Sequence, residues 1–200
     1  MPIYTLPKNT RLAKLRLKGN VQEVDCTSHA KYWAQGLSPF RLGPCKLKDG
    51  RTAKNMENAW QYSKVYADHL GRYDNVKKDW VEWSKNGFNS RFAERYPMGK
   101  GAIPKFSLYG NERLDYVRAK QLIYYPLYAK AVRKTEAYSR LVELYETCDI
   151  LVIRDFDAFN RRELNMTLMD VATASHKRSG HGFVLEMMLT WGPDFYKIFR

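Results

Sequence analysis

Three polar side chains recur at helical spacing in the stretch "MENAWQYSK", and their types could support chemistry. Glu57, Gln61 and Lys64 stand at positions i, i+4 and i+7, so a helix places them on one stripe with Trp60 beside it. A carboxylate and an ammonium in one site can move protons and neutralise charge on a ligand. The same spacing fits a solvated helix face on which these residues are ordinary neighbours, and both interpretations remain open.

A constrained loop lies just upstream of this stripe. The segment "GLSPFRLGP" contains two glycines and two prolines. Its Ser38 and its backbone amides could contact phosphate or hydroxyl groups of a ligand. By itself the loop is weak evidence for a site, and its position next to the stripe is what makes it of interest.

Further polar candidates lie in the C-terminal half of the chain. Asp155 and Asp157 close the run "ILVIRDFD", and because they alternate along an extended chain only one of them needs to face a cleft. A turn or N-cap role is the alternative for both. His181, in "SGHG", could contact a phosphate or donate a proton. Since no His, Cys or acidic cluster has metal-ligand spacing and no glycine-rich nucleotide motif follows a strand, we expect neither a metal nor a cofactor.

The elements that must position these residues begin with short strands. "VQEVDC" and "PCKLKDG" alternate apolar and polar residues, and the second ends in a turn pair, Asp49-Gly50. Apolar residues at intervals of three and four then predict a helix over about 53–70, with Thr52 as its N-cap. The looser, aromatic-rich segment 73–101 is expected to contribute a cleft wall or lid.

The remaining segments are mostly helical. The pattern predicts a helix within 111–134 that Pro126 bends or divides, and a second helix over 136–146. A continuous β-branched run within 148–157 is typical of a buried strand, and 181–191 forms a final apolar helix. This order predicts an α+β fold, a mostly helical single domain around a small β-sheet.

Net charge is the strongest signal in the composition. The 200 residues include 34 Lys and Arg against 21 Asp and Glu, which gives a net charge of +13. Such an excess attracts polyanions, so nucleic acid is the leading partner, with a merely soluble basic surface as the alternative. The basic residues are spread along the chain, and the sequence locates no single patch.

Composition also bears on the compartment. At 44% hydrophobic the chain can build one sizeable core, and no linker divides it. No apolar run approaches the length of a membrane span, and the N-terminus lacks a hydrophobic signal core, so we expect no membrane association and a cytoplasmic location. The three cysteines fit a reducing compartment and a structural role.

The stripe and the loop together resemble the signature of the NADAR family. That signature combines Ser-x-Phe, Lys-x-Asp-Gly and a helix with Glu-x-x-x-Gln-x-x-Lys, which here are "SPF", "KLKDG" and "MENAWQYSK". The later segments "RYPMGKG", "RAKQLIYYPLYAKAV", "ILVIRDFDAF" and "GHGFVLEMML" follow in the family's order. The resemblance spans residues 28–189 and implies one NADAR-like domain over residues 1–200.

The chain departs from the family pattern at two points. NADAR proteins usually have His directly after the helix Glu, where this chain has Asn58, and the usual Trp-Gly after the acidic strand is absent. A catalytic step that depends on that His therefore has no counterpart here. The departures indicate a divergent branch of the family, for which phages are a candidate source.

The resemblance implies cleavage of an N-glycosidic bond. NADAR proteins cleave N-glycosides of ribose phosphates or remove ADP-ribose from nucleobases, through an oxocarbenium-like state that a carboxylate stabilises. This implies Glu57 as the catalytic carboxylate and Asp155 or Asp157 as a second acid. Lys64 would neutralise a ribose phosphate or pair with Glu57. The other implied substrate contacts are Gln61 and Ser38 on sugar hydroxyls, Trp60 and Phe40 stacking on a base, and His181.

Two other functions remain open from sequence. The same pocket could serve a glycosyl- or group-transferase that builds a modified base. Alternatively, the chain could be a NADAR-shaped module that binds nucleic acid and has lost catalysis, with Asn58 as part of the loss. The leading hypothesis is hydrolysis of an ADP-ribosylated or otherwise modified nucleobase, within DNA or RNA.

Overall fold

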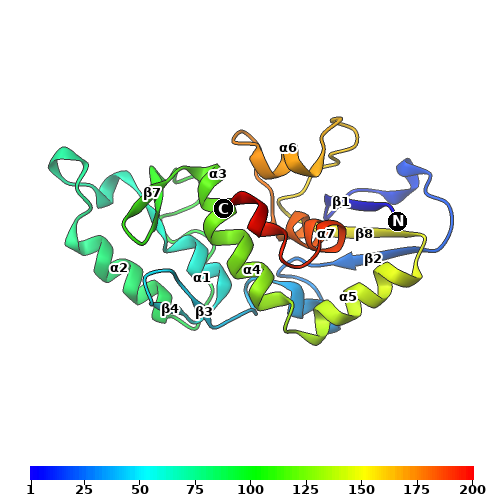
Figure 1. Cartoon of the computed structure of the whole chain (residues 1–200), viewed down its shortest axis with the longest axis horizontal. Helices are drawn as coiled ribbons and strands as arrows, with labels where there is room; N and C mark the ends of the chain where they lie inside the picture. The colour runs from blue at the N-terminus through cyan, green and yellow to red at the C-terminus, as the bar shows by residue number, and fades with distance from the viewer.

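A three-stranded parallel sheet organises one half of the protein. The computed structural model describes all residues, 1–200, and orders the strands β1 (Ile3–Pro7), β8 (Ile150–Asp155) and β2 (Val21–Asp25), with β8 in the middle (Figure 1). Strand β8 is the predicted buried strand, and its last five residues are all buried. Because the strands are parallel, their carboxyl ends meet at one edge of the sheet, the usual position of a ligand site in such sheets.

Two long helices pack against this sheet. Helix α7 (His181–Trp191) packs on β1 and β8, and its residues 181–188 are all buried, which explains why it is apolar all round. Helix α5 (Glu136–Thr147) packs against β8 and begins at Thr135, whose side chain accepts a hydrogen bond from the amide of Tyr138. Both helices were predicted within one residue of these bounds.

The other half of the protein is built from shorter elements. The predicted hairpin around Asp49-Gly50 is present as a short antiparallel pair. Strand order in the second small sheet is β5-β6-β7. The elements are β3 (Cys45–Lys46), β4 (Thr52–Ala53), α1 (Met56–Gln61), β5 (Lys64–Val65), α2 (Lys78–Asn89), β6 (Phe106–Tyr109) and β7 (Glu112–Leu114). Helix α6 (Leu168–Thr173) belongs to the first half, where it packs against α7.

The helix predicted over 53–70 is much shorter in the structure. Helix α1 covers only Met56–Gln61, and Asn55 rather than Thr52 caps it by accepting a hydrogen bond from the amide of Asn58. The chain then leaves the helix because Lys64 and Val65 pair with β6. Strand pairing between distant segments here overrides the helical pattern of the sequence. Thr52, the expected N-cap, belongs to β4.

One continuous helical run spans the segment around Pro126. Helix α3 (Tyr116–Ala119) runs through a π-helical turn (Lys120–Tyr124) into α4 (Tyr125–Val132). Pro126 lies in the first turn of α4, where its missing N–H is tolerated because the π-turn has already widened the backbone. The structure has neither a break nor a new helix start at Pro126: a π-turn precedes it and the helical conformation continues on both sides. Such π-turns are frequent at functional sites.

Residues of both halves share one core. A single cluster of 34 buried hydrophobic residues includes Leu151 and Phe183 beside the parallel sheet and Met56 and Phe88 beside α1. The fold is therefore α+β, with helices around small sheets, as predicted. Helix α2 was not predicted, although its buried residues Trp80, Ser84 and Phe88 recur at helical spacing. No helix combines the length and the apolar character that a membrane crossing requires.

Candidate active site

A cavity of about 440 Å³ opens at the carboxyl edge of the parallel sheet. Its walls come from α1, from the segment 95–104, from the π-turn and from the segment 175–181. Of the segment 73–101, which was expected to form a cleft wall or lid, the last residues line this cavity. Five predicted site residues from the N-terminal half line this cavity: Phe40, Glu57, Trp60, Gln61 and Lys64.

The polar stripe faces the cavity as a chain of hydrogen bonds. Gln61 Nε2 donates to Glu57 Oε1 at 2.8 Å, and Lys64 Nζ donates to Gln61 Oε1 at 2.7 Å. The Lys64 ammonium also lies 4.6 Å from the centre of the Trp60 ring. The solvated-face interpretation is therefore wrong for Glu57 and Gln61, which are buried, and the stripe is a fixed polar wall.

Burial in the cavity wall shifts the pKa values of Glu57 and Lys64, the two ends of this hydrogen-bonded series, in opposite directions. Burial raises the pKa of Glu57, against the lowering effects of the Gln61 hydrogen bond, Lys64, His181 and Arg95. Burial lowers the pKa of Lys64 to about 8, although the charge of Glu57 acts to raise it. A buried carboxylate with a raised pKa is thus linked through Gln61 to an ammonium whose pKa is lowered to about 8, a pairing typical of reactive sites.

Ser38 does not line this cavity. Its side chain is 1% exposed, its amide donates to the carbonyl of Gln35, and its hydroxyl accepts from the amide of Phe40 at 3.4 Å. Ser38 therefore closes the turn that carries Phe40 instead of contacting a ligand. Sequence alone also allows Phe40 to pack in the core, but Phe40 lines the cavity and is not a member of the hydrophobic core.

Asn58, at the position where the resembled family has His, points away from the cavity into the protein. Its side-chain amide donates to the carbonyls of Gly87 and Phe92 at 3.0 and 2.9 Å, and its Oδ1 accepts from the amide of Glu94. The residue is completely buried. Asn58 thus ties the segment that leads into the cavity wall to the end of α2, a structural role.

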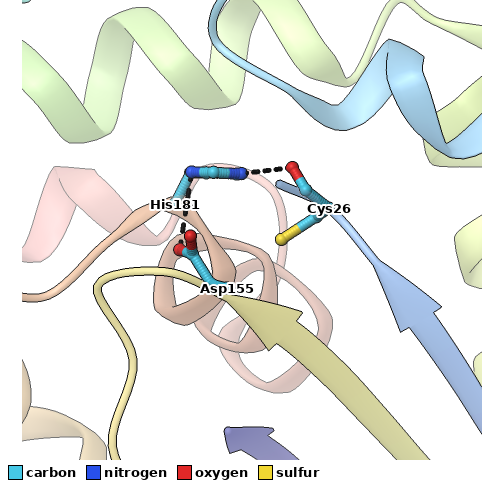
Figure 2. A group of neighbouring side chains, drawn as sticks. All are labelled: Cys26, Asp155 and His181. Carbon is cyan, nitrogen blue, oxygen red and sulfur yellow. Dashed lines mark hydrogen bonds and ion pairs between the residues drawn. The ribbon is translucent and has the colours of Figure 1, made fainter. Parts of the chain in front are cut away.

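The remaining three predicted residues, Asp155, Asp157 and His181, line the opposite side of the cavity. Figure 2 shows Asp155 at the end of β8 and His181 at the start of α7, beside Cys26, which directly follows β2. His181 Nδ1 lies 3.4 Å from Asp155 Oδ2, and His181 Nε2 lies 2.6 Å from the carbonyl of Cys26. Since a carbonyl only accepts, Nε2 carries the hydrogen.

Asp155 is also the anchor of helix α7. Its Oδ2 accepts from the amide of Gly182 at 2.8 Å and its Oδ1 from the amide of Phe156 at 2.6 Å. Asp155 is not an N-cap residue, because Gly180 holds that position on α7, but its carboxylate accepts a hydrogen bond from the first turn of the helix and lies beside His181. Asp157 instead pairs with Arg95, at 2.6 Å between Oδ2 and Nη2, and this ion pair joins two walls of the cavity.

Gly180 makes the close approach of Asp155 to α7 possible, and its replacement gives a first prediction. A Cβ at Gly180 would meet Asp155 Oδ2 at 2.1 Å, so Gly180→Ala should displace the carboxylate and cost about 1–3 kcal/mol of stability. Gly71→Ala is the control, because the nearest atom to its Cβ is 3.6 Å away. Denaturant unfolding measures both, and equal stabilities would contradict the packing described here.

The group of Cys26, Asp155 and His181 is the one cluster in the chain whose side chains could together ligate a metal. The sequence spacing did not reveal it, since the residues come from three separate segments. Both Asp155 oxygens accept backbone amides, and the Cys26 thiol contacts the carbonyl of Arg154 at 3.1 Å. Burial raises the pKa of Cys26 well above its usual value, which opposes the thiolate that a metal needs. These contacts fit a structural cluster better than a metal centre.

Lys120 is a site residue that the sequence did not single out. It lines the cavity from the π-turn, and its Nζ donates at 3.2 Å to the carbonyls of Val171 and Ala174 and to the hydroxyl of Ser179. Burial lowers its pKa to about 8. Three acceptors satisfy all three ammonium hydrogens, so Lys120 fixes the segment 174–179 that forms one wall.

Comparison with known proteins assigns neither a family nor a function to this chain. No protein-family model matches the chain, and no curated protein matches it either. The interpretation of the cavity therefore rests on its own geometry. It is a small-ligand cavity with a buried carboxylate on one wall, an aromatic ring beside it, and cations on several sides.

Proposed function

We propose that this protein is an N-glycoside hydrolase that removes ADP-ribose or a ribose phosphate from a nucleobase. The observation that carries the proposal is the buried Glu57 carboxylate, held at the cavity by Gln61 and Lys64. Glycoside cleavage passes through a cationic, oxocarbenium-like sugar, which a fixed carboxylate stabilises. The resemblance of "SPF", "KLKDG" and "MENAWQYSK" to the NADAR signature supports the same chemistry.

The proposed reaction displaces the base from the sugar by water. The C1′–N bond breaks and its electron pair leaves on the base nitrogen, which takes a proton from solvent in the cavity. Glu57 faces the positive charge that develops on the sugar and accepts a proton from the attacking water, whose oxygen bonds to C1′. Phe40 and Trp60 line the part of the cavity that takes the base, and Lys64, whose ammonium lies over the Trp60 ring, neutralises a phosphate of the substrate.

Product analysis tests this function. Wild-type protein is incubated with ADP-ribosylated DNA, ADP-ribosylated RNA and free ribosyl-phosphate N-glycosides, and small products are identified by mass spectrometry. We expect ADP-ribose or ribose phosphate, with the unmodified base, from at least one of them. Absence of release from all three by folded protein would contradict hydrolysis. Incorporation of labelled sugar into nucleic acid without net release would indicate a transferase.

The pH dependence of the rate follows from the two perturbed groups. Glu57 must be ionised, so the rate should rise with pH through a pKa above that of an ordinary carboxyl group. Lys64 must be charged, so the rate should fall as pH increases past about 8, where its ammonium loses a proton. Lys64→Arg keeps a charge at all these pH values and should move the alkaline limb upward. Lys78→Arg, at an exposed lysine, is the control and should leave the pH profile unchanged. If Lys64→Arg also left the alkaline fall in rate unchanged, Lys64 would not be the group that causes it.

A further inference from the structure

A second cavity, of about 760 Å³, lies on the other side of the wall formed by the segments 60–64 and 120–124. Lys120 and Tyr124 face the first cavity, whereas Gln121 and Ile123 face the second. The β3–β4 hairpin, the turn between β6 and β7, and α4 surround it, and Figure 1 shows α4 passing beside this hairpin. The proposed function uses none of the residues that line this second cavity.

Positive charge dominates the second cavity. Seven Lys or Arg side chains line it against one carboxylate, Asp49: Arg41, Lys46, Lys48, Arg51, Lys130, Lys134 and Arg200. Lys48 pairs with Glu112 at 2.7 Å and Arg51 pairs with Asp49 at 2.6 Å. The other five cations have no ion-pair partner within the protein. The dispersed charge of the sequence is therefore concentrated here by folding.

The fold does not need this concentration of charge. Lys130 and Lys134 lie at the C-terminal end of α4, where the helix dipole favours cations, but Arg41 and Lys46 come from the loop before β3 and from β3 itself. Like charges around one cavity repel each other, and no acid from the protein compensates the five unpaired cations. A polyanionic ligand would relieve that repulsion and release its counterions on binding.

The cavity lining indicates the kind of polyanion. Between the cations lie the partly exposed Leu47, Leu108 and Leu122, and Tyr109 stands at the edge with Lys48 Nζ 4.2 Å from its ring centre. Grooves that bind single strands combine cations along the backbone with apolar and aromatic surfaces for the bases. Double-stranded nucleic acid is not expected here, because a duplex carries its phosphates outside its bases and does not enter a cavity of this size. A membrane is not expected either, because its flat surface does not reach the floor of the cavity.

We propose that this basic groove binds the phosphodiester backbone of a single-stranded nucleic acid. The exposed cations contact phosphates, and the floor and Tyr109 contact unstacked bases. The proposal is independent of the chemistry in the first cavity, because the two cavities share no lining residue. It applies equally if the protein binds nucleic acid without catalysis.

The test measures binding of a fluorescein-labelled, mixed-sequence single-stranded DNA oligonucleotide, and its RNA equivalent, by anisotropy over a range of salt concentrations. The groove variant combines Lys46→Ala, Lys130→Ala and Lys134→Ala. The control variant combines Lys14→Ala, Lys78→Ala and Lys85→Ala, which are exposed lysines outside both cavities. Both variants lower the net charge by three, so they separate a specific groove from overall charge.

We expect the groove variant to bind at least tenfold more weakly. Its plot of log K against log salt should be shallower by about 2, because each lost phosphate contact to a single strand contributes about 0.7 to the slope. The control variant should remain close to wild type. Equal losses in both variants, or no binding by wild type, would overturn the proposal.

Two competitors identify other ligands. Displacement of the oligonucleotide by ADP at comparable phosphate concentration would indicate a small-nucleotide pocket, and displacement by poly-glutamate would indicate an acidic-peptide groove; either result overturns the single-strand proposal. The groove variant should also retain wild-type cleavage of a small ribosyl-phosphate N-glycoside. Failure of strand binding and failure of hydrolysis are therefore measured separately.

Discussion

Replacing Glu57 with Gln is expected to lower the hydrolysis rate by roughly 10³-fold while the protein stays folded. The amide has the same shape as the carboxylate, and its oxygen can still accept the hydrogen bond from Gln61. It carries no negative charge to stabilise the sugar cation and no basic site for the proton of water. Because burial disfavours the charged carboxylate, the variant should be at least as stable as wild type.

The matched control for this variant is Glu82→Gln, on the exposed face of α2 and outside the cavity. Rates are measured by product release, and folding is checked by thermal unfolding and circular dichroism. Glu82→Gln should keep the wild-type rate. Comparable rates for wild type and Glu57→Gln would exclude Glu57 as the catalytic carboxylate.

Asn58→Ala is expected to give the largest loss of stability, about 3 kcal/mol. The substitution leaves the amide of Glu94 without its partner, and it removes one of the two hydrogen bonds accepted by each of the carbonyls of Gly87 and Phe92, around a side chain that is completely buried. Since the segment after Glu94 forms a cavity wall, substrate affinity should fall as well. Denaturant unfolding measures the stability, and KM for the small N-glycoside reports on the wall.

Asn86→Ala provides the comparison for Asn58→Ala, because Asn86 is an exposed residue of the same type on α2. It should change the stability by less than about 0.5 kcal/mol. If both variants had the same stability, the network around Asn58 would not hold the wall. Asn58 would then be open to a direct role at the substrate.

Local spacing predicted part of the site because the relevant contacts are local. Glu57 and Gln61 are one helical turn apart, and even a helix of six residues brings them together. Lys64 joins them for a different reason: it belongs to β5 and is placed by pairing with β6. The sequence therefore identified the stripe, although it overestimated the length of the helix that carries it.

The missed features depend on contacts between distant segments. His181 meets Asp155 only because α7 begins at the carboxyl edge of a parallel sheet, and the strand pairs of that sheet join residues well over one hundred positions apart. Lys120 is distinguished from other lysines by three acceptors in residues 171–179. Spacing within a single segment carries no information on such contacts, and the basic groove escaped prediction for the same reason.

The most direct test of the central claim is the fate of water oxygen in the reaction. Wild type and Glu57→Gln are incubated with the cleaved substrate in water enriched in heavy oxygen, and the released sugar and base are weighed by mass spectrometry. We expect one heavy oxygen in the sugar, none in the base, and almost no labelled sugar from Glu57→Gln. Sugar released without the label, or labelled equally by both proteins, would contradict Glu57-dependent hydrolysis.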